Sequence, residues 1–139
     1  MNIVVDASVI VKWLLQDPDR EADTEKATRL MGTIVSGEQS VLQPVHWLTE
    51  VAAVLSREST ETATEDVAML SALEFPIADE VVVLPKACAL AIELRQHVFD
   101  SYYHAVALET ADTVLVTADE RYLRTARPKG RIIHLREWE

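Results

Sequence analysis

Short apolar runs, separated by stretches with helical patterning, constrain most how this chain can fold. They lie at residues 3–5, 41–43, 81–84, 113–116 and 131–135. The first run, Ile3-Val4-Val5, is β-branched and reads as a buried strand. Strands that alternate with helices are typical of an α/β fold with a parallel sheet. We therefore predict one α/β domain over residues 1–139, with a central, mostly parallel sheet of about five short strands flanked by helices.

Helices are predicted between these runs from the spacing of apolar residues. We expect them at residues 8–15, 21–35, 44–57, 62–73, 85–96, 101–110 and 119–125. Gly37 should close the second of them, whose apolar face carries Ala27, Leu30, Met31 and Ile34. Thr62 and Glu65 have the spacing of a capping box. Pro85 suits the first turn of the helix that it opens.

The charge of the chain argues at first against a nucleic-acid partner. The formal net charge is −10, whereas proteins that bind nucleic acid usually carry basic surfaces. Carboxylates that bind a divalent ion would invert this local field. Six of the thirteen basic residues also lie close together, at positions 121, 124, 127, 129, 131 and 136. These cations could meet phosphates or could surround a helix end and a solvated edge, and the sequence leaves both alternatives open.

The sequence predicts a cytoplasmic protein without a membrane segment. No apolar run approaches the roughly 18 residues that a membrane span needs, and the N-terminus lacks the pattern of a signal peptide. The single cysteine, Cys88, cannot form an intramolecular disulfide, which fits a reducing compartment. Its neighbours are apolar, so we expect Cys88 to be buried as a small hydrophobic residue.

Two aspartates follow predicted strands and are candidates for a shared site. Asp6 directly follows residues 3–5, and Asp119 follows residues 113–116 through Thr117 and Ala118. The carboxyl ends of parallel strands share one edge of the sheet, where ligands bind. Each aspartate could instead simply cap the helix that follows it.

Two further carboxylates occupy unusual helical positions. Glu50 lies on or beside the apolar stripe of its predicted helix, where an arginine partner would be the simplest structural explanation. Asp100 lies at the start of an apolar helix, and from that segment alone an N-cap role is the better explanation. Four converging carboxylates would repel one another unless a cation lay between them. Oxygen ligands select hard ions such as Mg²⁺ or Mn²⁺, which suit phosphodiester chemistry.

The segments around these four carboxylates resemble the motifs of PIN-domain nucleases. They are residues 5–13, Glu50 within Trp-Leu-Thr-Glu-Val-Ala, residues 99–103 and residues 115–123, and they span nearly the whole chain in the family's order. The greatest similarity is to the VapC-like toxins of type II toxin–antitoxin systems. Ser101, where alanine is commoner, and His104, where an apolar residue is usual, depart from the pattern.

The resemblance implies a PIN-like three-layer sandwich in which Asp6, Glu50, Asp100 and Asp119 are catalytic and hold Mg²⁺ or Mn²⁺. It also implies an RNA substrate, a homodimer and inhibition by a small antitoxin protein whose tail enters the acidic pocket. Thr117 matches a position that often supports the site. The expected function is that of a metal-dependent endoribonuclease and toxin.

Other α/β folds fit the residues that follow the first strand less well. A haloacid-dehalogenase-type phosphatase needs a second aspartate where this chain has Ser8, and a dinucleotide-binding fold needs glycines after the first strand. The remaining alternative is a non-catalytic PIN-like module that binds RNA or protein.

Overall fold

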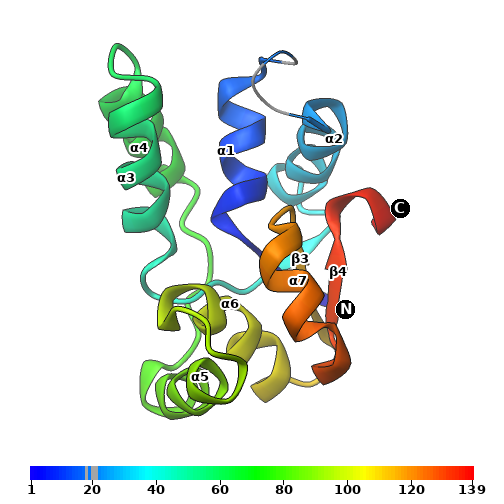
Figure 1. Cartoon of the computed structure of the whole chain (residues 1–139). Coiled ribbons are helices and arrows are strands. Elements are labelled where there is room, and N and C mark those ends of the chain that lie inside the picture. The colour runs from blue at the N-terminus through cyan, green and yellow to red at the C-terminus, as the bar shows by residue number, and fades with distance from the viewer. Residues whose placement is uncertain (18, 20–21) are drawn as a thin grey trace.

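A parallel sheet forms the centre of the molecule (Figure 1). The structure is a computed structural model that describes residues 1–17, 19 and 22–139. Within these residues the sheet has four strands in the order β2-β1-β3-β4, with all neighbours parallel. They are β1 (Asn2–Val5), β2 (Ser40–Val41), β3 (Thr113–Thr117) and β4 (Ile132–His134). The two central strands are the most deeply buried, as their β-branched sequences predict.

Helices flank the sheet, which confirms the predicted α/β class. The described residues form α1 (Ala7–Leu15), α2 (Thr24–Val35), α3 (Trp47–Glu58), α4 (Ala63–Ala72), α5 (Glu80–Leu94), α6 (Val98–Glu109) and α7 (Glu120–Ala126). Short 3-10 helices follow α7 at Arg127–Lys129 and β4 at Leu135–Glu137. Figure 1 shows α1 and α2 on one side of the sheet and α5 and α6 on the other. None of the helices described is long and apolar enough to cross a membrane.

The chain reverses its direction across the sheet at β1. It leaves β1 through α1 and α2 to reach β2, and then returns past β1 to β3 through α3 to α6. Right-handed crossovers that run in opposite directions place their helices on opposite faces of the sheet. A crevice therefore opens between them at the carboxyl ends of β1 and β3, the usual ligand site of such sheets.

The packing of α2 follows its sequence pattern. Its buried residues are Ala27, Leu30, Met31 and Ile34, the four predicted to face the core. Gly37 adopts a φ of 85° just after the helix, a conformation that glycine accepts without steric cost, and so ends the helix as predicted. Residue 21, where the prediction began this helix, lies outside the described residues.

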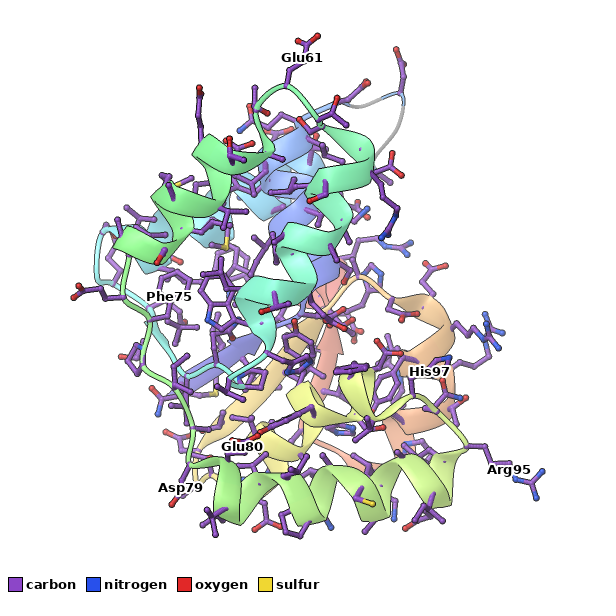
Figure 2. All side chains as sticks on the ribbon, turned by 90° about the vertical axis from the view of Figure 1, so that its left-hand side faces the viewer. Glu61, Phe75, Asp79, Glu80, Arg95 and His97 are labelled. Atoms are coloured by element: carbon purple, nitrogen blue, oxygen red, sulfur yellow. The ribbon has the colours of Figure 1, made fainter. Side chains whose placement is uncertain are left out.

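The prediction of a strand at residues 81–84 is wrong, because this segment forms the first turn of α5. Asp79 caps that helix by accepting a hydrogen bond from the Val81 N–H at 3.0 Å. Helix α5 lies along α6 and presents Val83, Ala87 and Leu90 to the core, at helical spacing (Figure 2). Val81 and Val82 are 82% and 54% exposed, so the run as a whole lacks the burial that a central strand requires.

Helix starts elsewhere also differ from the prediction. The helix expected from Pro44 begins at Trp47. Thr62 precedes α4 but forms no capping box, because its hydroxyl donates to the Asp66 carboxylate at 3.0 Å instead. Pro85 lies inside α5 rather than in its first turn.

Gln43 extends the hydrogen bonding of β1 beyond the end of the short strand β2. Its fully buried side chain accepts a bond from the Val5 N–H at 2.8 Å and donates to the Val5 carbonyl at 2.9 Å. Its backbone pairs with Pro76 and Ala78, both at 2.9 Å. Gln43 thus fixes the peptide that immediately precedes Asp6, a role that a lone glutamine after an apolar run does not reveal in the sequence.

Replacement of Gln43 by methionine should destabilise the fold. Gln43→Met keeps the length of the side chain but leaves the Val5 N–H and carbonyl buried without partners, at a cost of about 2–5 kcal/mol. Urea denaturation should show this loss in the free energy of unfolding. Gln16→Met, at an exposed position, is the matched control, and equal stability of the two variants would contradict the role of Gln43.

Candidate active site

Asp6 is a buried carboxylate at the carboxyl end of β1. It is 9% exposed and occupies the N-cap position of α1, yet its side chain makes no capping hydrogen bond. Instead one carboxylate oxygen, Oδ2, accepts hydrogen bonds from the hydroxyls of Ser8 at 2.5 Å and Thr117 at 3.0 Å. The capping explanation therefore fails for Asp6, and the side chain is oriented by two hydroxyl donors.

The same two hydroxyls bind the chain that leaves β3. Thr117 Oγ1 accepts a hydrogen bond from the Asp119 N–H, and Ser8 Oγ accepts one from the Ala118 N–H, both at 3.0 Å. Asp119 itself caps α7, since its Oδ1 accepts from the Tyr122 N–H at 3.0 Å. The ends of β1 and β3 are thus joined by side chains, and Asp6 and Asp119 are held at neighbouring positions.

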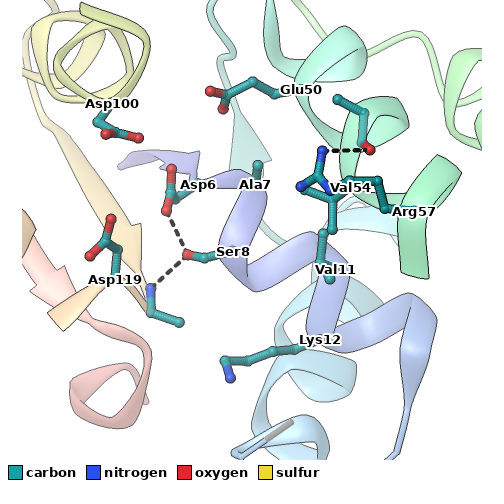
Figure 3. A pocket seen from close by; sticks show the side chains of 12 residues that line it. Asp6, Ala7, Ser8, Val11, Lys12, Glu50, Val54, Arg57, Asp100 and Asp119 are labelled. Atoms are coloured by element: carbon teal, nitrogen blue, oxygen red, sulfur yellow. Dashed lines mark hydrogen bonds between the residues drawn. The ribbon is translucent and has the colours of Figure 1, made fainter. Parts of the chain in front are cut away.

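Glu50 and Asp100 approach this edge from α3 and α6. Asp100 is the third residue of α6, whose N-cap position is occupied by His97, so the capping role predicted for Asp100 is wrong. Glu50 Oε1 lies 3.8 Å from His46 Nε2, so a histidine takes the place of the arginine partner that the structural alternative required. Figure 3 shows both carboxylates pointing toward the space above Asp6.

All four predicted carboxylates line one pocket. Its volume is about 500 Å³, within the range of small-molecule sites. Asp6, Glu50, Asp100 and Asp119 occupy one end of it (Figure 3). The topology brings together side chains that are far apart in the sequence, as the positions of the two aspartates after parallel strands predict.

Burial and mutual repulsion raise the pKa values of three of these carboxylates. Burial raises the pKa of Asp6 to about 6 despite its two hydroxyl donors, and the charges of Asp100 and Asp119 add to the effect. The pKa of Glu50 rises to about 7, mainly through burial and further through Asp6 and Asp100. Burial, followed by the charge of Asp119, also raises the pKa of Asp100. The four side chains therefore act on one another electrostatically.

His46 and Tyr103 border Glu50 and were not predicted as part of the site. His46 bonds the Phe99 carbonyl through Nε2 at 2.9 Å and stacks on Tyr102 with ring centroids 4.8 Å apart. Tyr103 is fully buried, and its hydroxyl lies near enough to Glu50 to lower the pKa of that carboxyl, although it makes no hydrogen bond of normal geometry to any described residue. These aromatic groups look like core residues in the sequence, which gives no signal of their position.

The donor set fits a hard divalent cation. All four predicted ligands offer carboxylate oxygens, which Mg²⁺ and Mn²⁺ prefer. In the arrangement of the described residues, however, no group of three or more His, Cys, Asp or Glu side chains is gathered tightly enough to hold a metal ion directly. Mg²⁺ commonly keeps several waters and takes only one or two carboxylates directly, so carboxylates spread around a pocket suit it.

Comparison with known families agrees with this geometry. The family model described as PIN domain matches residues 3–128, which is most of the chain and includes all four carboxylates. The chain belongs to the PIN domain family. PIN domains are generally nucleases that use divalent metal ions. No curated protein sequence matches this PIN domain.

Two other residues of this PIN domain were singled out by the sequence. His104, which departs from the family pattern, is fully buried and bonds the Tyr122 hydroxyl at 3.0 Å and the Gly130 carbonyl at 2.8 Å. It is therefore a packed histidine with both ring nitrogens engaged. Cys88 is exposed on α5, so the prediction that it is buried is wrong. Its neighbours Ala87 and Leu90 face the core, whereas Cys88 lies on a solvent-facing side of the same helix.

Neutralisation of Asp6 should stabilise the metal-free protein at high pH. Burial raises the folded-state pKa of Asp6 to about 6. The folded protein is therefore most stable at low pH, where Asp6 is protonated, and it loses stability as the pH rises through about 6 and Asp6 ionises. Asp6→Asn abolishes this loss, so at pH 8 in chelator the variant should be more stable by on the order of 3 kcal/mol. At about pH 4 the difference should nearly vanish.

Urea denaturation at the two pH values measures this difference. Glu65→Gln, which neutralises an exposed carboxylate on α4, controls for the change in net charge. A variant at Asp6 that is less stable than the wild type at pH 8 would show that burial of this carboxylate carries no electrostatic cost.

Proposed function

We propose that this PIN domain is a metal-dependent endoribonuclease that hydrolyses RNA phosphodiester bonds. The observation that carries the proposal is the buried Asp6 carboxylate, held by two hydroxyls in a pocket that three other carboxylates also line. A protein keeps such mutually repelling charges at the expense of stability, which is typical of a functional site. The family resemblance supports RNA as the substrate.

Asp6, Glu50, Asp100 and Asp119 would hold Mg²⁺ or Mn²⁺. When bound, such an ion offsets charge on a phosphoryl group and lowers the pKa of a bound water. The chain itself contributes orientation, since Ser8 and Thr117 hold Oδ2 of Asp6 in place. In the protein alone the pKa of Glu50 lies near 7, so binding of the ion near neutral pH would release a proton from this carboxyl.

We further propose that the protein is the toxin of a toxin–antitoxin pair, works as a homodimer and acts in the cytoplasm. The similarity of its motifs to VapC-like toxins supports this role and the expectation of a small antitoxin protein as inhibitor. A short reading frame directly upstream, with a DNA-binding N-terminus, would support the pairing. Sedimentation of the purified protein tests the dimer.

A non-catalytic PIN-like module is the second candidate. The observation in its favour is that no three potential ligands among the described residues are gathered tightly around one point. Retention of all four carboxylates in one pocket favours the enzyme.

RNA cleavage with Mn²⁺, with and without chelator, separates the two candidates. Wild-type protein should cleave single-stranded RNA only with the metal, and Asp6→Asn should abolish cleavage without loss of the fold. Thr117→Val keeps the shape of the side chain but removes a donor to Asp6, and should lower the rate about 10–100-fold. Glu65→Gln should cleave like the wild type. Undiminished cleavage in chelator or by Asp6→Asn would contradict the metal mechanism.

A further inference from the structure

Two adjoining hollows meet at the carboxylates. The pocket described above and a second one of about 260 Å³ share Asp100 and Asp119 as lining residues. The first extends from these residues between α1 and α3, and the second extends toward the end of α5 and the start of α7. We call the two hollows together the track, since they form a path past the carboxylates in both directions.

The first hollow has an apolar floor and a cationic end. Its floor consists of small and branched apolar side chains from α1 and α3, namely Ala7, Val11, Ala53 and Val54. Lys12 and Arg57 line the same hollow, on the side away from Asp100 (Figure 3). The Arg57 guanidinium bonds the Ala53 carbonyl at 3.1 Å on its own helix, which places its charge along the wall of the hollow. A flat apolar group and a neighbouring anion would both find partners here.

The second hollow is polar and also cationic. It is lined by Arg95 at the end of α5, by Gln96 and His97 in the connection to α6, and by Arg121 in the first turn of α7. Cations therefore lie on both sides of the acidic centre, although the whole chain carries a net charge of −10.

Most of the other C-terminal cations are already engaged within the protein. Arg127 pairs with Glu137 at 2.8 Å, and Lys129 pairs with Glu93. Arg131 donates to the Ala107 and Thr110 carbonyls at 3.1 and 2.6 Å.

Arg136 is engaged in the same way, because it contacts both Asp23 and Glu120. For these four residues the structure favours a structural role over contact with phosphate. Of the six basic residues between positions 121 and 136, Arg121 is the one that lines the track.

We propose that the track binds single-stranded RNA across the carboxylates, with Lys12 and Arg57 on one side and Arg95 and Arg121 on the other contacting phosphates. This inference rests on the proposed function and names the residues of this chain that would hold its substrate. The apolar floor beside Arg57 would receive an unstacked base, which a duplex does not offer. Phosphate contacts on both sides would hold the scissile bond at the acidic centre, where the protein alone repels it.

Salt-dependent RNA binding tests the track in the Asp6→Asn background, in which the RNA should stay intact. Fluorescence anisotropy with a labelled single-stranded RNA gives the dependence of log K on log salt concentration, whose slope is about −0.7 per phosphate contact. Arg57→Gln and Arg121→Gln should each weaken binding and reduce the slope by about 0.7. Arg124→Gln, on the same helix as Arg121 but outside both hollows, and the exposed Arg29→Gln are the matched controls.

Each outcome decides the proposal. The proposal is supported if the salt dependence of binding is reduced in both track variants and in neither control, and if a duplex of the same sequence binds more weakly. The proposal would be overturned by equal slopes in all variants or by an effect confined to one side of the carboxylates. Equal binding of the duplex, or no binding of RNA at all, would also overturn it. Metal-dependent cleavage by the wild type together with equal slopes would overturn the track and leave the proposed function standing. Cleavage of the RNA by Asp6→Asn itself would instead contradict the proposed function.

Discussion

The structure depends most on the two hydroxyls that hold Asp6 between β1 and β3. Thr117 and Ser8 each donate to the same oxygen of Asp6 and each accept a backbone N–H from the segment that follows β3. This network joins the ends of the two central strands through a carboxylate that is almost completely buried. Gln43 fixes the preceding peptide from the other side. The position of Asp6 is thus determined by hydrogen bonds on both of its flanks.

The same arrangement carries an electrostatic cost that only a function would justify. Asp6, Glu50 and Asp100 all have raised pKa values, first through burial and then through the charges of their neighbours. Well-packed apolar residues in these places would make a more stable protein, and the exchange of stability for a charged site is common in enzymes. A divalent cation would remove the repulsion and convert this cost into binding energy. In our proposal the acidity of the pocket and the cations of the track belong to one arrangement, in which the centre would bind metal and the sides would bind phosphate.

Much of the fold could be predicted because local and long-range signals agree. The β-branched residues 3–5 and 113–116 are buried central strands, and the α2 stripe faces the core. The apolar residues at 81–84 have a local composition that favours a strand, but the Asp79 cap and the packing against α6 select a helix. Tertiary context overrides propensity in such short apolar segments.

The carboxylates of the candidate site were predicted, and the resemblance also pointed to Thr117, but the other supporting contacts were not predicted. Two aspartates after parallel strands suffice to expect a shared edge, and the family resemblance supplies Glu50 and Asp100, whose local sequence favoured other roles. The sequence could not show that Ser8 binds Asp6 rather than capping a helix, that Gln43 binds Val5, or that Tyr103 lies beside Glu50. These contacts depend on the exact approach of elements that are distant in the chain.

The central claim is that the four carboxylates hold a divalent cation together. Titration of chelator-treated protein with Mn²⁺ at pH 8, followed by electron paramagnetic resonance of the free ion, measures this binding without any RNA. The account predicts saturable binding by the wild type and by Glu65→Gln, with affinity about tenfold or more weaker in Asp6→Asn and in Asp119→Asn. Absence of saturable binding by the wild type, or equal affinity in all four proteins, would contradict it.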